Sequence, residues 1–263
     1  MFRPVMQMSA PVRLRIGYVV QNKPQGQTSL PDIVDKELHE SAFNINMMAD
    51  IEVLSASEAV AKIADLDGLF ISGKQQTGDD GDIVSPAEAN PVLNVLLRRA
   101  VARQVPVLST SNGFRQMNNA LLADSPLTIT LPERGASLFV KPASVENSDL
   151  NQNPLANKGT AGHSNRVRFE TYGVLGKMFP GNHYQQLQIE HRQSLTELSP
   201  QLVPEAYTEN NQVVAYSLAS KKSFYLAVNW KLHANEQRIF LNQQLIKSFV
   251  LACRKFAKRS DSK

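Results

Sequence analysis

The sequence predicts a three-layer α/β fold, in which a mostly parallel central sheet carries helices on both faces and a small antiparallel part adjoins it. Apolar runs of strand length alternate with helical patterns through the first half of the chain, which is typical of strand–helix units in a parallel sheet. A sharp strand-to-helix turn follows one buried run at Ser111. In the second half, two apolar runs are separated only by Ala219-Ser-Lys-Lys222, which indicates a hairpin.

The first half of the chain contains three further predicted strands and three helices. The strands are the apolar runs 14–20, 51–54 and 67–72. A helix is expected over 31–43, and a second is expected after Ser55, because Glu58 stands at the spacing of a capping box.

A third, longer helix is expected to begin at Ser85. Pro86 suits a first-turn position, and Glu88 completes a second capping-box pattern. Its predicted apolar stripe consists of Leu93, Leu96, Leu97 and Ala100.

The second half is expected to be more antiparallel. The two strands of the hairpin are 212–218 and 223–230, and the Asn-, Gly-, Ser- and Thr-rich segment 148–165 is interpreted as a mobile loop. The apolar spacing over 235–258 predicts a long amphipathic helix. Cys253 falls on its apolar face, so we expect a packed thiol rather than a catalytic one.

Length and composition limit the classes of protein. The 263 residues, of which 42% are apolar, suit one domain over 14–258 with flexible tails at 1–13 and 259–263. The net charge of +4 is modest, and the basic residues near the C-terminus are interpreted as a solvated helix end. We therefore expect no nucleic-acid and no membrane partner. A single cysteine and an N-terminus without a signal-peptide core favour a cytoplasmic location.

The turn at Ser111 is the main candidate functional feature. A buried strand (105–108), a turn (110–113) and a helix beginning near Phe114 have the pattern of a nucleophile elbow. The N–H groups that open such a helix form a site for an oxyanion. Ser72 and Gly73 also lie at the carboxyl end of a predicted strand, so they are expected to face the same cleft. No metal-ligand cluster is present in the sequence, so we expect no metal and no cofactor.

Four segments together resemble a class I glutamine amidotransferase domain of the γ-glutamyl hydrolase branch, over residues 14–256. The segment 66–73 resembles the family's "LDG-apolar-apolar-PGG" loop, and 105–116 resembles "IPILGICRGLQ". The segment 224–230 is similar to "GVQWHPE", and 189–193 more weakly to "S-x-H-x-Q". The resemblance implies a flavodoxin-like sheet.

The resemblance also implies that the catalytic triad is replaced. The family's nucleophilic cysteine falls on Ser111, its histidine on Lys231 and its glutamate on His233. A serine needs a base, and a protonated lysine is none, so we expect no glutaminase activity. The resemblance places ligand-binding groups at six further positions: Ser72, Gly73, Lys74, Asn112, His191 and Gln193.

Three hypotheses remain open. The first is a degenerate amidotransferase-like protein that binds a small carboxylate, a γ-glutamyl or amino-acid-like ligand, or a protein partner. The second is a serine hydrolase of γ-glutamyl or other amide bonds, with Ser111 activated by His163, His191 or His233. The third is a structural component of a complex. For each position there is also a purely structural interpretation, Ser111 as a turn residue and Lys231 as a strand-end residue.

Overall fold

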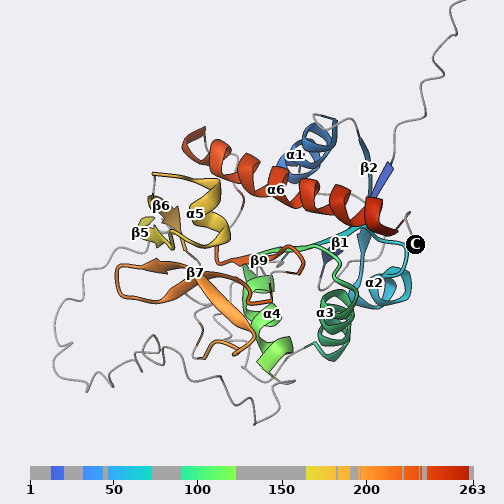
Figure 1. Ribbon diagram of the computed structural model, residues 1–263, viewed down its shortest axis with the longest axis horizontal. Coiled ribbons are helices and arrows are strands. Elements are labelled where there is room, and N and C mark those ends of the chain that lie inside the picture. Colours follow the sequence, from blue (N-terminus) through green and yellow to red (C-terminus); the bar gives the residue numbers. More distant parts are fainter. Residues whose placement is uncertain are drawn as a thin grey trace, which may run out of the picture.

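The computed structural model describes residues 13–20, 32–43, 47–72, 90–122, 164–181, 183–189, 195, 197–220, 222–230, 232 and 236–260. One sheet of nine strands runs through these residues, in the order β2-β1-β3-β4-β9-β8-β7-β5-β6. Figure 1 shows the helices gathered on its two sides. The predicted α/β class, with a mostly parallel central sheet, is confirmed.

The sheet has a parallel part and an antiparallel part. Its parallel strands are β1 (Arg13–Val20), β2 (Met48–Leu54), β3 (Gly68–Ser72), β4 (Val107–Thr110) and β9 (Tyr225–Val228). Its antiparallel strands are β5 (Ser164–Phe169), β6 (Tyr184–Gln188), β7 (Leu202–Thr208) and β8 (Val213–Leu218). The predicted hairpin corresponds to β8 and β9. The antiparallel part is larger than expected, because β5, β6 and β7 join it.

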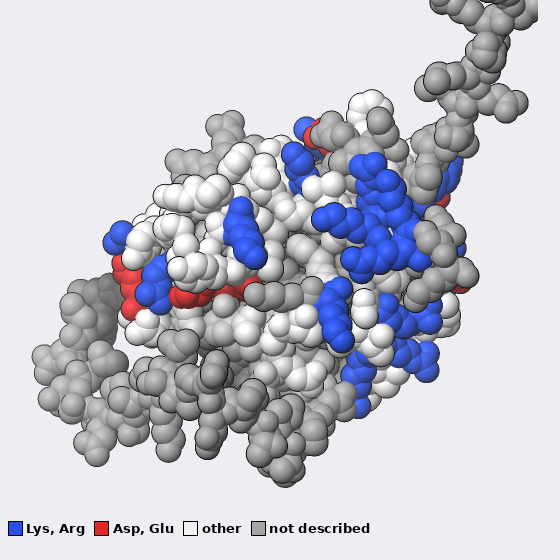
Figure 2. Space-filling model, in the orientation of Figure 1, with Lys and Arg blue, Asp and Glu red and all other residues white. Residues whose placement is uncertain are grey.

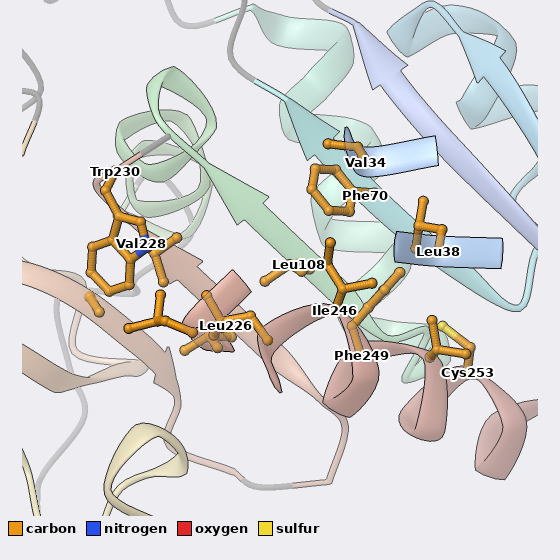
Figure 3. Packing of buried hydrophobic residues seen from close by; sticks show 14 of the residues in the cluster. Val34, Leu38, Phe70, Leu108, Leu226, Val228, Trp230, Ile246, Phe249 and Cys253 are labelled. Carbon is orange, nitrogen blue, oxygen red and sulfur yellow. The ribbon is translucent and has the colours of Figure 1, made fainter. Parts of the chain in front are cut away.

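Two hydrophobic clusters hold helices against the two faces of the sheet. One cluster joins the sheet to α1 (Asp32–Phe43), α5 (Val174–Met178) and α6 (Glu236–Ser260). The other joins it to α2 (Ala56–Lys62), α3 (Pro91–Arg103) and α4 (Asn112–Leu122). Figure 3 shows Phe70 of β3 between Val34 and Leu38 of α1 and Phe249 of α6.

The first residues of α2 and α3 can be compared with the predicted helix N-termini. The capping box of α2 is present: the Ser55 hydroxyl accepts from the Glu58 N–H, and the Glu58 carboxylate accepts from the Ser55 N–H. The predicted start of α3 at Ser85 is wrong, because the helix begins at Pro91. Asn90 caps it, its side chain accepting from two N–H groups of the first turn, and 85–89 lie outside the described residues.

The predicted apolar faces of α3 and α6 are confirmed. The stripe from Leu93 to Ala100 is buried, and so is Cys253, whose thiol pKa is raised well above its usual value by burial. β1 begins at Arg13 and α6 ends at Ser260, so both elements reach into the expected tails. Of the predicted loop 148–165, Ser164 and Asn165 belong to β5, and the rest lies outside the described residues.

In the part of the chain that the structure describes, no helix is long and apolar enough to span a membrane.

Candidate functional site

Ser111 is the single residue between β4 and α4. Its φ of 55° lies in the left-handed region, which costs an L-residue roughly 1–2 kcal/mol. Its N–H donates to the Val228 carbonyl at 3.0 Å, and its carbonyl accepts from the Phe114 N–H at 2.9 Å. This is a strained strand-to-helix elbow, as the sequence pattern predicts. The helix begins at Asn112, two residues earlier than expected.

Gly113 allows α4 to lie this close to the sheet. A Cβ on Gly113 would overlap the Ser109 hydroxyl and would lie 3.1 Å from Cγ2 and from the carbonyl oxygen of Ile71. The Ser109 hydroxyl is buried beneath this turn and has no hydrogen-bond partner among the described residues. The first turn of the helix therefore rests directly on β3 and β4 without room for a side chain.

The register of the sheet brings three strand ends to the same level. Thr110 pairs with Ser72 on one side and with Val228 on the other. Ser111 and Asn229 follow these paired residues directly, so they are neighbours at the carboxyl edge of the sheet. Asn229 is buried, and its Oδ1 has no hydrogen-bond partner in the described part of the chain.

Asn229 was not predicted as a site residue. Its signal is a polar residue directly after the apolar run 224–228. An unpaired buried amide oxygen is costly in a protein interior. It is therefore a candidate acceptor for a ligand N–H group.

A second contact joins the end of β6 to this edge. Ile189 forms an antiparallel bridge with Trp230, whose ring stacks on Phe169 with centroids 6.4 Å apart. Figure 3 shows Trp230 beyond Val228 at the end of β9. The first residue of the resembled segment 189–193 therefore lies beside the last residue of the segment 224–230.

Only part of the predicted site belongs to the described residues. Gly73, Lys74, Lys231, His233, His191, Gln193 and His163 lie outside the described residues, as do the side chains of Ser72 and Asn112. The expected proximity of Ser111 and Lys231 remains a prediction. Within the described residues, the Ser111 side chain is buried and its hydroxyl forms no hydrogen bond.

The two described histidines lie away from the elbow. His39 is on α1, where its Nε2 lies 3.5 Å from the carboxylate of Asp35. His183 precedes β6 at the end opposite the Ile189–Trp230 bridge. Six residues of extended chain separate His183 from Ile189, which corresponds to about 20 Å. Neither imidazole is a candidate base for Ser111.

The elbow is also fixed from the side of β8. The Tyr216 hydroxyl donates to the Phe114 carbonyl in the first turn of α4, and burial raises the pKa of this phenol well above its usual value. No acidic residue stands in the first turn of α4. The helix N-terminus, with the positive end of its dipole, therefore favours an anion. No metal-binding cluster occurs among the described residues.

The fold and the elbow together define a class I glutamine amidotransferase-like protein. The family model named Peptidase C26 matches residues 40–234, more than half of the chain, and the chain belongs to this family. The resemblance inferred from the sequence is thereby confirmed. No curated protein matches the chain.

Solved structures share the fold at low sequence identity. A putative GMP synthase component from Thermoplasma acidophilum has a TM-score of 0.54 at 14% identity, covering 94% of this chain and 98% of its own. The glutaminase domain of CTPS from Trypanosoma brucei, with bound acivicin, has a TM-score of 0.58 at 15% identity, covering 92% of this chain and 94% of its own.

Proposed function

We propose that this Peptidase C26 protein binds a small carboxylate or amino-acid-like ligand at the elbow and lacks glutaminase activity. The observation that carries the proposal is the residue at the tip. Position 111 has the backbone geometry of a nucleophile elbow but carries a hydroxyl. A serine hydroxyl is hardly ionised near neutral pH and needs an adjacent base, and no described imidazole lies near it.

The remaining geometry supports binding. The N-terminus of α4 favours a carboxylate, and the buried Oδ1 of Asn229 can accept a hydrogen bond from an amino or amide group. Lys231, which follows Trp230 in the sequence, supplies a positive charge where the family has a histidine. A ligand with both a carboxylate and an N–H donor, such as glutamate or a γ-glutamyl compound, satisfies all three groups.

Calorimetry with L-glutamate, γ-glutamyl compounds and glutarate tests the proposal. We expect weak binding that strengthens at low salt, because charges at a cleft mouth are screened. Lys231→Ala should weaken it, whereas Lys222→Ala, at the other end of β9, should not. Absence of binding by all three ligand types, or equal affinity of the two lysine variants, contradicts the proposal and favours a purely structural role in a complex.

The strained φ of Ser111 favours one second candidate, a serine hydrolase, because nucleophile elbows present their reactive side chain in this way. A fluorophosphonate probe, which labels activated serines, separates the two candidates. We expect no labelling of the native chain and no release of ammonia from glutamine. Labelling that disappears in Ser111→Ala but persists in Ser109→Ala would establish the hydrolase instead.

A further inference from the structure

Basic side chains gather around the amino ends of the central strands, at the side of the sheet opposite the elbow. The last two turns of α6 carry Arg254, Lys255, Lys258 and Arg259, three of them exposed. Figure 2 shows Lys and Arg side chains over this end of α6 and across α2 and α3, with few acidic side chains between them. The sequence alone suggests only a solvated helix end here.

Two other segments bring further basic residues to the same edge. Arg99 and Arg103 are in the last turns of α3, which leads into the amino end of β4, and Lys222 precedes the amino end of β9. At the amino end of β3, a Cβ on Gly68 would overlap the Cys253 sulfur, so the C-terminal part of α6 packs there. We call the seven residues Arg99, Arg103, Lys222, Arg254, Lys255, Lys258 and Arg259 the basic edge.

The basic edge lies apart from the elbow. It surrounds the amino ends of β3, β4 and β9, whereas Ser111 follows the carboxyl end of β4. The four residues of β4 alone span about 13 Å. The basic edge is therefore spatially distinct from the site proposed above.

The two helices that carry most of the basic edge supply almost no acidic residues. α3 contains no acidic residue, and α6 contains only Glu236, at its opposite end. Among the described residues, none forms an ion pair with Arg103, Lys222 or Arg259, whereas the nearby carboxylate of Asp65 lies 3.8 Å from Arg15.

One pair of like charges repels on the exposed side of α6. Lys255 and Arg259 are four residues apart on the helix, and both are exposed. Such pairs are destabilising, and the helix C-terminus offsets only part of that cost. An anionic partner would relieve the repulsion.

The exposed face of α3 indicates what kind of anionic partner fits. Val92 and Val95 are 39% and 41% exposed, and their spacing places them in one row with Arg99 and Arg103. Arginine is enriched in protein interfaces, and the two valines add exposed apolar area beside the arginines. Phe256, the aromatic residue in the same turns of α6, packs against the hydrophobic cluster on the α2–α4 face of the sheet, whereas aromatic residues that bind nucleic acids stack on the bases.

We propose that the basic edge and the valines of α3 form a docking surface for a protein that presents carboxylates beside aliphatic side chains. This surface goes beyond the ligand site at the elbow.

Fluorescence anisotropy with the full chain tests the proposal. Two fluorescein-labelled peptides of equal length are compared, one of glutamate alone and one with leucine at every fourth position, together with a short DNA duplex. The leucine-containing peptide should bind most tightly, and its affinity should fall with added salt. The variant K255Q/R259Q should weaken both peptides roughly five- to ten-fold. V92S/V95S should weaken only the leucine-containing peptide.

The matched control is R166Q/R168Q, which removes the same charge from exposed residues of β5, far along the sheet. It should leave both affinities within about two-fold, since only charges in the interface contribute. Circular dichroism checks that each variant is folded. Equal effects of K255Q/R259Q and R166Q/R168Q, or no peptide binding, overturn the docking surface. A duplex that binds as tightly as the leucine-containing peptide overturns it in favour of nucleic acid.

Discussion

The backbone N–H of Ser111 donates to the carbonyl of Val228 at 3.0 Å, so the tip of the elbow is bonded to the neighbouring strand rather than left free above it. The carbonyl of Ser111 is occupied as well, by the Phe114 N–H. Position 111 is therefore held in its left-handed conformation by backbone bonds on both sides. Its strain is stored by the surrounding fold.

Replacing Ser111 with glycine should give a more stable protein than replacing it with alanine. Glycine adopts a positive φ without the steric cost, although its greater freedom in the unfolded chain offsets part of the gain. We expect the free energy of unfolding of Ser111→Gly to be higher than that of Ser111→Ala by about 0.5–1 kcal/mol. Unfolding in urea measures both values. Equal stability of the two variants would show that position 111 is not strained.

Gly113→Ala should be strongly destabilising. The added methyl group overlaps the Ser109 hydroxyl, and overpacking of this kind costs about 1–3 kcal/mol. Ser109→Ala alone should be nearly neutral, because it removes a buried hydroxyl that has no partner among the described residues. In the double variant the cost should fall by about half, since the close approach to Ile71 remains. Additive effects of the two substitutions would contradict this packing.

A buried carboxylate on β7 gives the protein a specific pH dependence. Glu205 accepts from the Ser217 hydroxyl at 2.5 Å and from the Leu175 N–H at 3.1 Å. Burial raises its pKa despite these bonds and the nearby charge of Lys177. The folded state therefore binds this proton more tightly than the unfolded state.

The stabilising contribution of Glu205 is thus fully present below its unfolded pKa of 4.5 and is lost as pH rises through its folded pKa. Glu205→Gln, which does not titrate, should gain stability relative to the wild type as pH rises through that range. Chemical unfolding at a series of pH values measures the difference. A difference that is constant with pH would mean that Glu205 titrates alike in both states.

Cys253 should not react with a thiol reagent in the folded protein. Its side chain is buried against Gly68, and burial raises its pKa, so both access and thiolate formation are suppressed. With Ellman's reagent, we expect modification only at the rate of unfolding, and rapid modification in urea. Rapid labelling without denaturant would contradict the packing of α6.

Local sequence patterns correctly predicted helices that have clear capping residues or a wide apolar face. Ser55 with Glu58 identified the start of α2, and the apolar spacing located α6 almost to the residue. The start of α3 was misplaced because Ser85 and Asn90 both carry cap signals followed by proline, and only the tertiary structure decides between them. The strand β6 escaped detection because only Leu187 of its five residues is buried.

The position of the elbow in the chain was predictable from the sequence. The residues that lie beside it in space were not. The order of a buried strand, a turn and a helix sufficed to locate Ser111. The adjacency of Asn229 depends on the pairing of β4 with β9, which are more than a hundred residues apart in sequence. Nothing local indicates that pairing.

The hydrogen bond from Tyr216 to α4 has a consequence for which side chains position 111 can carry. Its phenol donates to a backbone carbonyl, and the contacts of Ser111 with Val228 and Phe114 also involve only backbone atoms. The side chain at position 111 therefore takes no part in building the turn that displays it. Such a position is interchangeable: a thiol, a hydroxyl or a methyl group can occupy it in the same place, so the group at the tip can change without any remodelling of the scaffold.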